Sequence, residues 1–404
     1  MIDVLIVGAG PAGAIAGLVL ARAGARVRIV DRAAFPRDKL CGDTINPGTL
    51  AHLRRLGVAT EIERRGLRVD GMLVTGDDDI AVVGRYPADV HGVAIVRRDL
   101  DAMLLQHAVA AGCGFEPSVA VRRAMLSADG SGGGPRLAGV HVDAEGGSRQ
   151  MTAPVVIAAD GRRSTLAFGL GLARHPARPR RWAIGAYFEG ACGPAFGAVA
   201  ADRPNGDGPA PRIGEMHIRA AGYIGVAPVP DGLTNVCVVK PSHAADATLR
   251  DPESTLRRAL IADARLRERF ASARLVTPPV VLGPLAVDAS SDAVEGLLLA
   301  GDAAGFIDPM TGDGLRFAIR GGELAAAAAL QALEHGWSGV HAGLAQARAR
   351  EFAGKQRFNR ILRTLVASPR AMSAAAAGAR VAPPVLRAVI RHAGDCGVAA
   401  RHAT

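Results

Sequence analysis

The sequence predicts an α/β protein in which a Rossmann-like, dinucleotide-binding domain carries an inserted antiparallel sheet and is followed by a helical C-terminus. A strand, a glycine-rich turn, a helix and a second strand ending on an acid occupy the first 31 residues. Two more apolar runs, at 155–159 and 297–300, each lead directly into a pair made of one Asp and one Gly. From about 181 to 240, strand-like segments alternate with Gly and Pro turns, as in an antiparallel sheet.

The first element is a βαβ unit with a dinucleotide fingerprint. An apolar run ends at Gly8, and Gly10 and Gly13 follow before an alanine-rich helix. Gly8 permits a sharp turn, Gly10 lets backbone N–H groups approach a pyrophosphate, and Gly13 lets the helix lie close to the sheet. Asp31 ends the second strand and is placed to accept hydrogen bonds from a ribose. This pattern predicts that the protein binds a dinucleotide.

Two later segments resemble further contacts with the same ligand. Asp160-Gly161 follows a buried strand and is expected near the pyrophosphate of the dinucleotide. Gly301-Asp302 follows another buried strand and opens a glycine-rich loop that leads into a long helix near Gly314. Asp302 is suitably placed for the ribityl hydroxyls of a flavin, and the helix N-terminus for the negative charge that reduction leaves on the flavin ring.

These separated contacts imply a discontinuous domain. We expect a nucleotide domain over 1–180, with a hairpin at 67–90 that joins the substrate domain. The substrate domain, mainly an antiparallel sheet, is expected over 181–280, and the nucleotide domain returns over 281–335. A basic helical region is expected over 336–404. Helices are expected at about 49–56, 99–111, 252–273 and 340–365, and a long loop at 194–211.

Composition narrows the class of protein. The chain has 404 residues, 49% of them hydrophobic, and a formal net charge of +10. No apolar run reaches the ~18–20 residues of a membrane span, and we expect the first strand to begin at Ile2 with no signal peptide before it. The five scattered cysteines form no CxxC pair, so we expect no metal site and a reducing cytoplasm.

The positive charge is concentrated in the last 64 residues, which hold eleven Arg or Lys against two acids. This region is either a solvated helical surface or a contact for an acidic partner, with an anionic membrane surface and a carrier protein as candidates. The protein would then be cytoplasmic with a peripheral membrane location as one alternative. Nucleic acid is not expected, because the basic residues are not interleaved with aromatic stacking groups.

The trio GAGPAG…DR, ADGRRS and GDAAGFIDPMTGDG resembles the FAD-dependent oxidoreductases of the para-hydroxybenzoate hydroxylase fold, whose nucleotide domain is of the glutathione reductase type. The segment FPRDKLCG is similar to the F-x-R-x-K-x-C-G segment of the geranylgeranyl reductase-like branch. Residues 222–236 are a variant of that branch's Y-x-W-x-F-P…N-V-G segment, with Gly225 and Ala227 in place of its Trp and Phe. This departure suggests a wider pocket or a different substrate.

The resemblance implies FAD as cofactor and NAD(P)H as a transient reductant. It places Arg98 among the FAD-binding residues and Arg37 and Cys41 near the flavin. The full set of expected cofactor-binding residues is Gly8, Gly10, Ala12, Gly13, Asp31, Arg32, Arg37, Cys41, Gly42, Arg98, Asp160, Gly161, Gly301, Asp302, Pro309, Gly312 and Gly314. Candidate catalytic residues are Cys41, Asp313 beside the flavin-facing loop and Tyr223 on the substrate sheet.

The resemblance to these FAD-dependent oxidoreductases indicates the cofactor more specifically than the reaction. The first expectation is a monooxygenase that hydroxylates a lipophilic or polyketide-type aromatic small molecule. The alternative is a flavin-dependent reductase of a C=C bond in an isoprenoid-like, geranylgeranyl substrate. A third possibility, of another class, is a flavin-holding protein that binds a partner through its basic tail. Halogenation is disfavoured because the G-W-x-W-x-I-P motif is absent, and no G-x-S-x-G elbow indicates a hydrolase.

Overall fold

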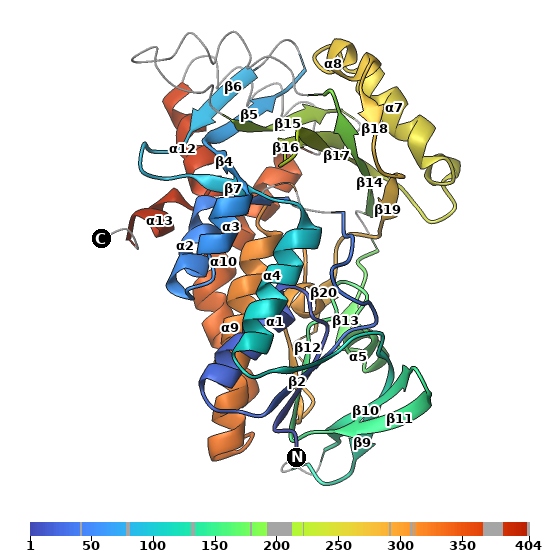
Figure 1. The fold of residues 1–404 in the computed structure, drawn as a ribbon, viewed down its shortest axis with the longest axis vertical. Helices are drawn as coiled ribbons and strands as arrows, with labels where there is room; N and C mark the ends of the chain where they lie inside the picture. The colour runs from blue at the N-terminus through green and yellow to red at the C-terminus, as the bar shows by residue number, and fades with distance from the viewer. Residues whose placement is uncertain are drawn as a thin grey trace.

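Two sheets organise the computed structural model, one in each half of the molecule (Figure 1). The structure describes residues 1–40, 43–77, 81–130, 134–177, 180–191, 212–220, 222–290, 292–307, 310, 312–366 and 383–401. The predicted cofactor residues Cys41, Gly42 and Pro309 and the loop expected at 194–211 lie outside these ranges.

The lower half contains a five-stranded parallel sheet. Its order is β21 (Leu297–Leu299), β12 (Val155–Ala158), β1 (Val4–Val7), β2 (Val27–Val30) and β8 (Gly114–Glu116). β1 is buried on both faces, since Val4 and Ile6 lie in one hydrophobic core and Leu5 and Val7 in another. Strands that are covered on both sides need continuous apolar runs, and this explains the unbroken VLIV and VVIA segments.

Different layers cover the two faces of this sheet. The helices α1 (Pro11–Arg22), α4 (Arg97–Ala110) and α9 (Gly314–His335) share the core on one face. On the other face lie β9 (Ala120–Ser127), β10 (Arg136–Ala144) and β11 (Gly147–Thr152), an antiparallel sheet, with α5 (Thr165–Gly169) beside β9. The result is the Rossmann-like layer arrangement expected from the first βαβ unit.

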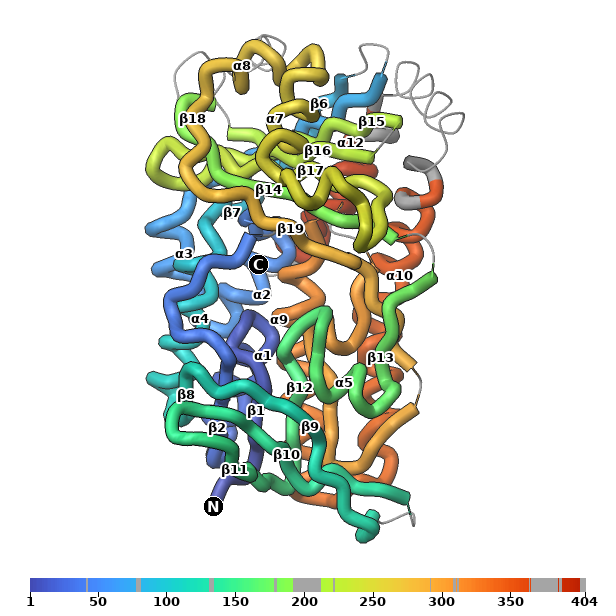
Figure 2. The backbone as a smooth tube through the Cα atoms, turned by 90° about the vertical axis from the view of Figure 1, so that its right-hand side faces the viewer, coloured from blue at the N-terminus to red at the C-terminus, as the bar shows by residue number. Residues whose placement is uncertain are grey.

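The upper half is an eight-stranded sheet made largely from the middle of the chain (Figure 2). Its order is β18 (Arg274–Leu275), β14 (Arg181–Glu189), β17 (Leu233–Pro241), β16 (Gly222–Pro228), β15 (Ile213–Arg219), β5 (Gly71–Thr75) and β6 (Ala81–Arg85), and β19 (Val280–Leu282) also pairs with β14. Its pairings are antiparallel except that between β15 and β5. The helices α7 (Pro252–Ala262) and α8 (Arg267–Ala271) cover one face and share a core with Phe188 and Val236.

The segment expected to form one hairpin at 67–90 contains three strands. β5 and β6 pair with each other and join the large sheet, as expected. β4 (Leu67–Val69) instead pairs with β7 (Gly92–Ala94), which also pairs with β3 (Thr44–Ile45). The helices α2 (Pro47–Arg55) and α3 (Thr60–Arg65) lie next to this small sheet (Figure 1). A final pair, β13 (Ala173–Arg174) with β20 (Asp288–Ala289), and two 3-10 turns, η1 (Ala247–Leu249) and η2 (Gly301–Ala304), complete the connections.

The C-terminal region is folded onto the rest of the molecule. α10 (Val340–Val366) lies along α9, α12 (Pro383–Ala393) lies against β6, and α13 (Cys396–Arg401) lies against α2. Ile390 of α12 is 3% exposed, and a Cβ built on Gly84 of β6 would lie 2.5 Å from its Cγ2 atom. This contact joins the end of the chain to the upper sheet. Among the described residues, no helix is long and apolar enough to cross a membrane.

We predict that Ile390→Ala lowers the free energy of unfolding by roughly 2–4 kcal/mol, because it leaves a cavity against β6. Urea titration monitored by circular dichroism would measure the loss. Ile361→Ala on α10 is the matched control, since that side chain is 58% exposed. Equal stability of the two variants would contradict the docking of α12 described above.

Candidate functional site

The glycine turn after β1 has the close contacts that its sequence predicts. A Cβ on Gly13 would lie 1.9 Å from the carbonyl oxygen of Gly8, so no larger residue fits there. Gly8 itself has φ +102° and faces the backbone of Ala159 and Asp160, where a Cβ would lie 2.5 Å from the Ala159 oxygen. The turn therefore holds β1, β12 and α1 together at van der Waals distance.

The N-terminus of α1 is open to an anion. Its N-cap residue, Gly10, supplies no side-chain cap, and the first turn contains no acid. The Arg37 guanidinium lies beside it, 3.6 Å from where a Cβ on Gly10 would be. Free backbone N–H groups, the helix dipole and a neighbouring arginine form a site suited to a pyrophosphate.

Arg37 is held in place by a buried acid. Its Nη2 atom lies 3.2 Å from Oδ2 of Asp101, which is fully buried, and its guanidinium lies 4.7 Å from the centre of the Phe35 ring. Asp101 also accepts two hydrogen bonds from Arg97, at 2.7 and 2.8 Å. Two arginines share one carboxylate, so the cluster keeps one net positive charge beside the phosphate-binding turn.

Three predicted acids lie at the carboxyl edge of the parallel sheet because β2, β12 and β21 all end there. Asp31 accepts hydrogen bonds from the backbone N–H groups of Ala9 (2.8 Å) and Ala33 (2.9 Å). Asp160 accepts one from Thr165 N–H through Oδ2, while its buried Oδ1 has no hydrogen-bond partner among the described residues. Burial raises the pKa of Asp160. A buried acceptor left without a donor fits a ligand that brings hydroxyl or water donors.

The returning segment completes this edge. Gly301 and Asp302 begin η2, and a Cβ on Gly301 would lie 2.9 Å from Cβ of Ala12 in α1. Gly312 has φ +69°, and Gly314 begins α9, whose first turn has neither a side-chain cap nor an acid. This second open helix N-terminus matches the position assigned to the flavin ring. The described residues on this edge thus fit an FAD molecule from pyrophosphate to ring.

Three other residues that the sequence predicts at the cofactor site have different surroundings: Arg32, Gly161 and Arg98. Arg32 is exposed, and its charge opposes the rise in the pKa of Asp160 that burial causes. Gly161 follows Asp160 with φ +85°. The Arg98 side chain is 56% exposed and lies 4.0 Å from Asp38, and its contact with FAD stays a prediction. The buried arginine is its neighbour Arg97, which pairs with Asp101 four residues later. Residues i and i+4 lie one helical turn apart, so this spacing in the sequence could have predicted the ion pair between Arg97 and Asp101.

The three catalytic candidates have different surroundings. Cys41 lies outside the described residues. Tyr223 of β16 is 4% exposed and belongs to an apolar cluster with Met216, Val239 and Met310, so it lies beside the loop that precedes α9. It also borders a cavity of about 520 Å³ that reaches Arg219, Lys240 and α7. Asp313 is 1% exposed and is bound by Lys355 (3.1 Å), Asn359 (3.1 Å) and Asn46 (3.3 Å).

Sequence reasoning missed Asp43, which joins the two halves of the molecule. Its Oδ2 atom accepts hydrogen bonds from the Tyr187 hydroxyl (2.8 Å) and the Asn235 amide (2.5 Å), both on the large sheet. Its Oδ1 atom accepts one from Arg97 N–H at 3.1 Å. Burial raises the pKa of Asp43 to about 7, although these donors and the charge of Arg97 act against the rise. Asn235 is 192 positions away in the chain, and no local pattern links the two residues.

Comparison with known proteins agrees with this geometry. A family model described as FAD binding domain matches residues 1–191. A menaquinone reductase of Mycolicibacterium smegmatis is 33% identical over 343 residues, which cover 80% of this chain and 75% of that protein. Digeranylgeranylglycerophospholipid reductase 1 of Methanopyrus kandleri is 29% identical over 82% of this chain and 81% of its own. The chain belongs to this family of FAD-dependent oxidoreductases.

Solved structures of other proteins share the fold of this chain over nearly its whole length. A flavin-dependent brominase superimposes with a TM-score of 0.79 at 21% identity and covers 98% of this chain and 94% of its own. A geranylgeranyl bacteriochlorophyll reductase-like protein from Thermoplasma acidophilum gives a TM-score of 0.73 at 21% identity, covering 90% and 87%. At these identities the likeness concerns the fold alone, and the predicted fold class is confirmed. FAD is the cofactor of this enzyme.

We predict that Asp43→Asn flattens the pH dependence of stability between about pH 4 and 7. In that range the folded protein keeps a proton on Asp43 that the unfolded chain has lost, because the pKa is near 3.9 when unfolded and about 7 when folded. This carboxyl therefore makes the free energy of unfolding fall as pH rises, by about 1.4 kcal/mol per pH unit within the range.

Urea titrations at several pH values would measure this slope. Asp38→Asn is the control, because Asp38 lies in the same part of the chain with its side chain 90% exposed. A slope for Asp43→Asn equal to that of the parent protein would contradict the assignment.

Proposed function

We propose that this FAD-dependent oxidoreductase reduces C=C bonds in a lipid that carries an isoprenoid chain. The observation that carries the proposal is the similarity to the menaquinone reductase, at 33% identity across most of both chains. The name of a second relative gives a digeranylgeranyl phospholipid as its substrate. When bound, FAD would pass an electron pair from NAD(P)H to the substrate.

The large sheet offers a suitable apolar surface for such a chain. Met216, Ile218 and Tyr223 lie on the sheet face that shares a cluster with Phe306 and Met310 of the loop before α9. Gly225 lies two residues after Tyr223 on the same face, because side chains alternate along a strand. Among the described residues, a Cβ on Gly225 would meet only the Cys237 oxygen, at 3.9 Å, which leaves space where the related segment has Trp. This arrangement supports a bulky lipophilic substrate.

The chain's own residues would bind, orient and shield such a substrate. Asp31, Arg37, Asp160 and Asp302 would hold FAD at the sheet edge, and the first turn of α9 would stabilise negative charge on its ring. The apolar cluster around Tyr223 would exclude water from the reacting bond. Asp43, with its pKa near 7, can hold or release a proton at the junction of the two halves.

The test is a product assay with FAD-loaded protein, NADH or NADPH, and either menaquinone or a geranylgeranyl lipid in detergent. We expect mass spectrometry to show products that have gained two hydrogens per reduced bond. Hydroxylation of a lipophilic aromatic, the first expectation from the sequence, remains a prediction. If hydroxylation is the reaction, aromatic substrates supplied in air should give products that have gained oxygen. Such products, with no hydrogenated lipid in the first assay, would contradict the proposal.

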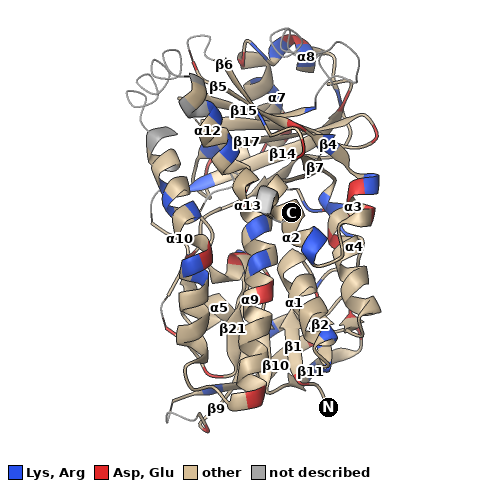
Figure 3. Ribbon diagram, turned by 90° about the vertical axis from the view of Figure 1, so that its left-hand side faces the viewer, with Lys and Arg blue, Asp and Glu red and all other residues tan. Residues whose placement is uncertain are grey.

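We also propose that the enzyme reaches its lipid through an anionic membrane surface. The exposed arginines of α10 and α12 carry the argument (Figure 3), and we call them the basic face: Arg357, Arg360, Arg387 and Arg391. None of them forms an ion pair with a described residue. Ile361, 58% exposed, adjoins Arg360 on α10. Arginines beside an exposed apolar side chain suit the headgroup region of an anionic bilayer.

Replacing the four arginines of the basic face by Gln should lower the affinity for phosphatidylglycerol-containing vesicles at least about tenfold, because each arginine near the surface contributes. Co-sedimentation measures the binding. The control removes the same charge from exposed arginines elsewhere: Arg64, Arg122, Arg123 and Arg258. Equal losses for the two variants would contradict a localised face, and binding to an acidic carrier protein without vesicle binding would replace the membrane by that partner.

A further inference from the structure

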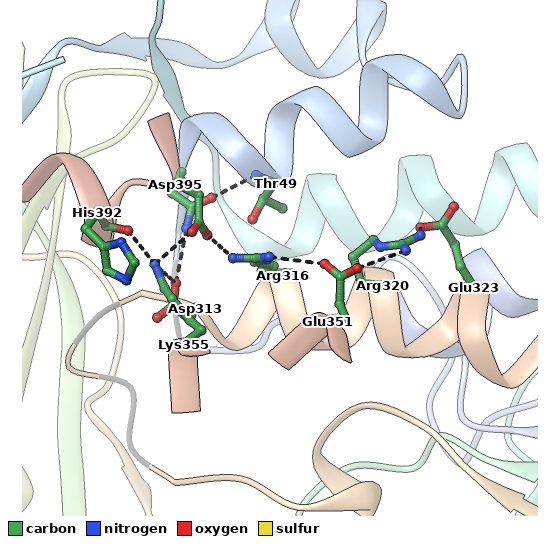
Figure 4. Close-up of polar contacts among 10 residues, drawn as sticks. Thr49, Asp313, Arg316, Arg320, Glu323, Glu351, Lys355, His392 and Asp395 are labelled. Atoms are coloured by element: carbon green, nitrogen blue, oxygen red, sulfur yellow. Dashed lines mark hydrogen bonds and ion pairs between the residues drawn. The ribbon is translucent and has the colours of Figure 1, made fainter. Parts of the chain in front are cut away.

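A continuous chain of ion pairs, most deeply buried around Lys355, joins the N-terminus of α9 to the last helices of the protein (Figure 4). Lys355 of α10 lies 3.1 Å from Asp313 and 3.1 Å from Asp395, which separates α12 from α13. The remaining pairs continue along α9 and α10: Asp395 with Arg316 (2.6 Å), Arg316 with Glu351 (3.1 Å), Glu351 with Arg320 (3.1 Å), Arg320 with Glu323 (2.5 Å), and Glu323 with Arg55.

The charges of this chain alternate and cancel, since it contains four acids and four bases. Asp313, Lys355 and Asp395 are 1%, 4% and 7% exposed, so water contributes little to their neutralisation. The Lys355 ammonium also donates to the carbonyl oxygens of His392 (2.8 Å) and Ala393 (2.7 Å). Loss of one partner would leave an uncompensated charge in a buried site.

Asp313 connects this chain to the cofactor site. It occupies the N-cap position of α9, directly before Gly314, yet its side chain makes no capping hydrogen bond. Lys355, Asn359 and Asn46 instead hold its carboxylate. The first backbone N–H groups of α9 are therefore left for the flavin ring, while the negative charge of Asp313 beneath them is balanced by Lys355.

We propose that Lys355 and Asp395 are positioning residues which, through Asp313, set the electrostatic environment of FAD from the C-terminal helices. They would not touch FAD or substrate. Reduced flavin carries negative charge on the ring edge assigned to α9, so an uncompensated carboxylate nearby disfavours reduction and an uncompensated ammonium favours it. The C-terminal region is then part of the redox site as well as the carrier of the basic face. This inference does not depend on which substrate the enzyme reduces.

The proposal predicts shifts of opposite sign in the midpoint potential of bound FAD. In Lys355→Met the unbalanced carboxylates lower the potential, and the ratio of reduced to oxidised FAD at a fixed poise falls about tenfold, or about 30 mV for two electrons. In Asp395→Asn the excess positive charge raises it. Asp395 has φ +54°, a conformation that Asn adopts readily, so this variant keeps the backbone. The double variant restores neutrality and should return towards the parent potential.

Anaerobic dye-linked titration of the FAD-loaded full chain measures these potentials without any substrate. Arg350→Met is the matched control, because Arg350 lies on the same helix, is exposed and donates to Gln346 rather than to the chain of ion pairs. We expect its potential to equal that of the parent. Shifts of the same sign in the two variants, or no shift in Asp395→Asn, would overturn the proposal. If Lys355→Met fails to fold, Asp395→Asn alone tests the proposal: a raised midpoint potential supports it, and an unchanged or lowered one overturns it.

Discussion

The parallel pairing of β21, β12, β1 and β2 is the constraint on which the site depends. Each strand runs in the same direction, so the residues that follow them meet at one edge of the sheet although they are separated by more than 100 positions in the chain. Asp31, Asp160 and Asp302 lie on one edge, where a single ligand would meet all three, only because of this register. The contact between Gly13 and the Gly8 oxygen sets how closely α1 can approach the edge, and with it where its N–H groups point.

Buried charge is balanced with similar strictness in the last 64 residues. The two acids of this region, Glu351 and Asp395, both form ion pairs in the chain that begins at Asp313. The arginines of the basic face, on α10 and α12, form no ion pair with a described residue. A single arrangement therefore explains why a region rich in Arg and Lys has a neutral interior and a positive exterior. A buried charge must be paired because it has lost its hydration, whereas an exposed arginine needs no ion pair because water solvates it.

FAD and the proposed substrate would be bound by surfaces of different chemical character. FAD would be held by backbone N–H groups, by glycines that allow close approach and by a few buried charges. The substrate would meet one face of the large sheet, where apolar side chains surround Tyr223 and small residues such as Gly225 leave space. The first surface changes little among enzymes that use the same cofactor. The second varies with the substrate, which is why kinship defines the cofactor more sharply than the reaction.

The sequence by itself determined the fold class and most of the cofactor edge. Strand, turn and helix signals are local, so the βαβ unit, Asp160 and Asp302 could be found within windows of a few residues. Arg98 as an FAD-binding residue stays a prediction, and the arginine that the structure buries against Asp101 is its neighbour Arg97. Only the tertiary structure decided the surroundings of Asp43, Asp101, Asp313 and Lys355. Their partners lie up to 267 positions away, and a buried charge is defined by what the whole fold places around it.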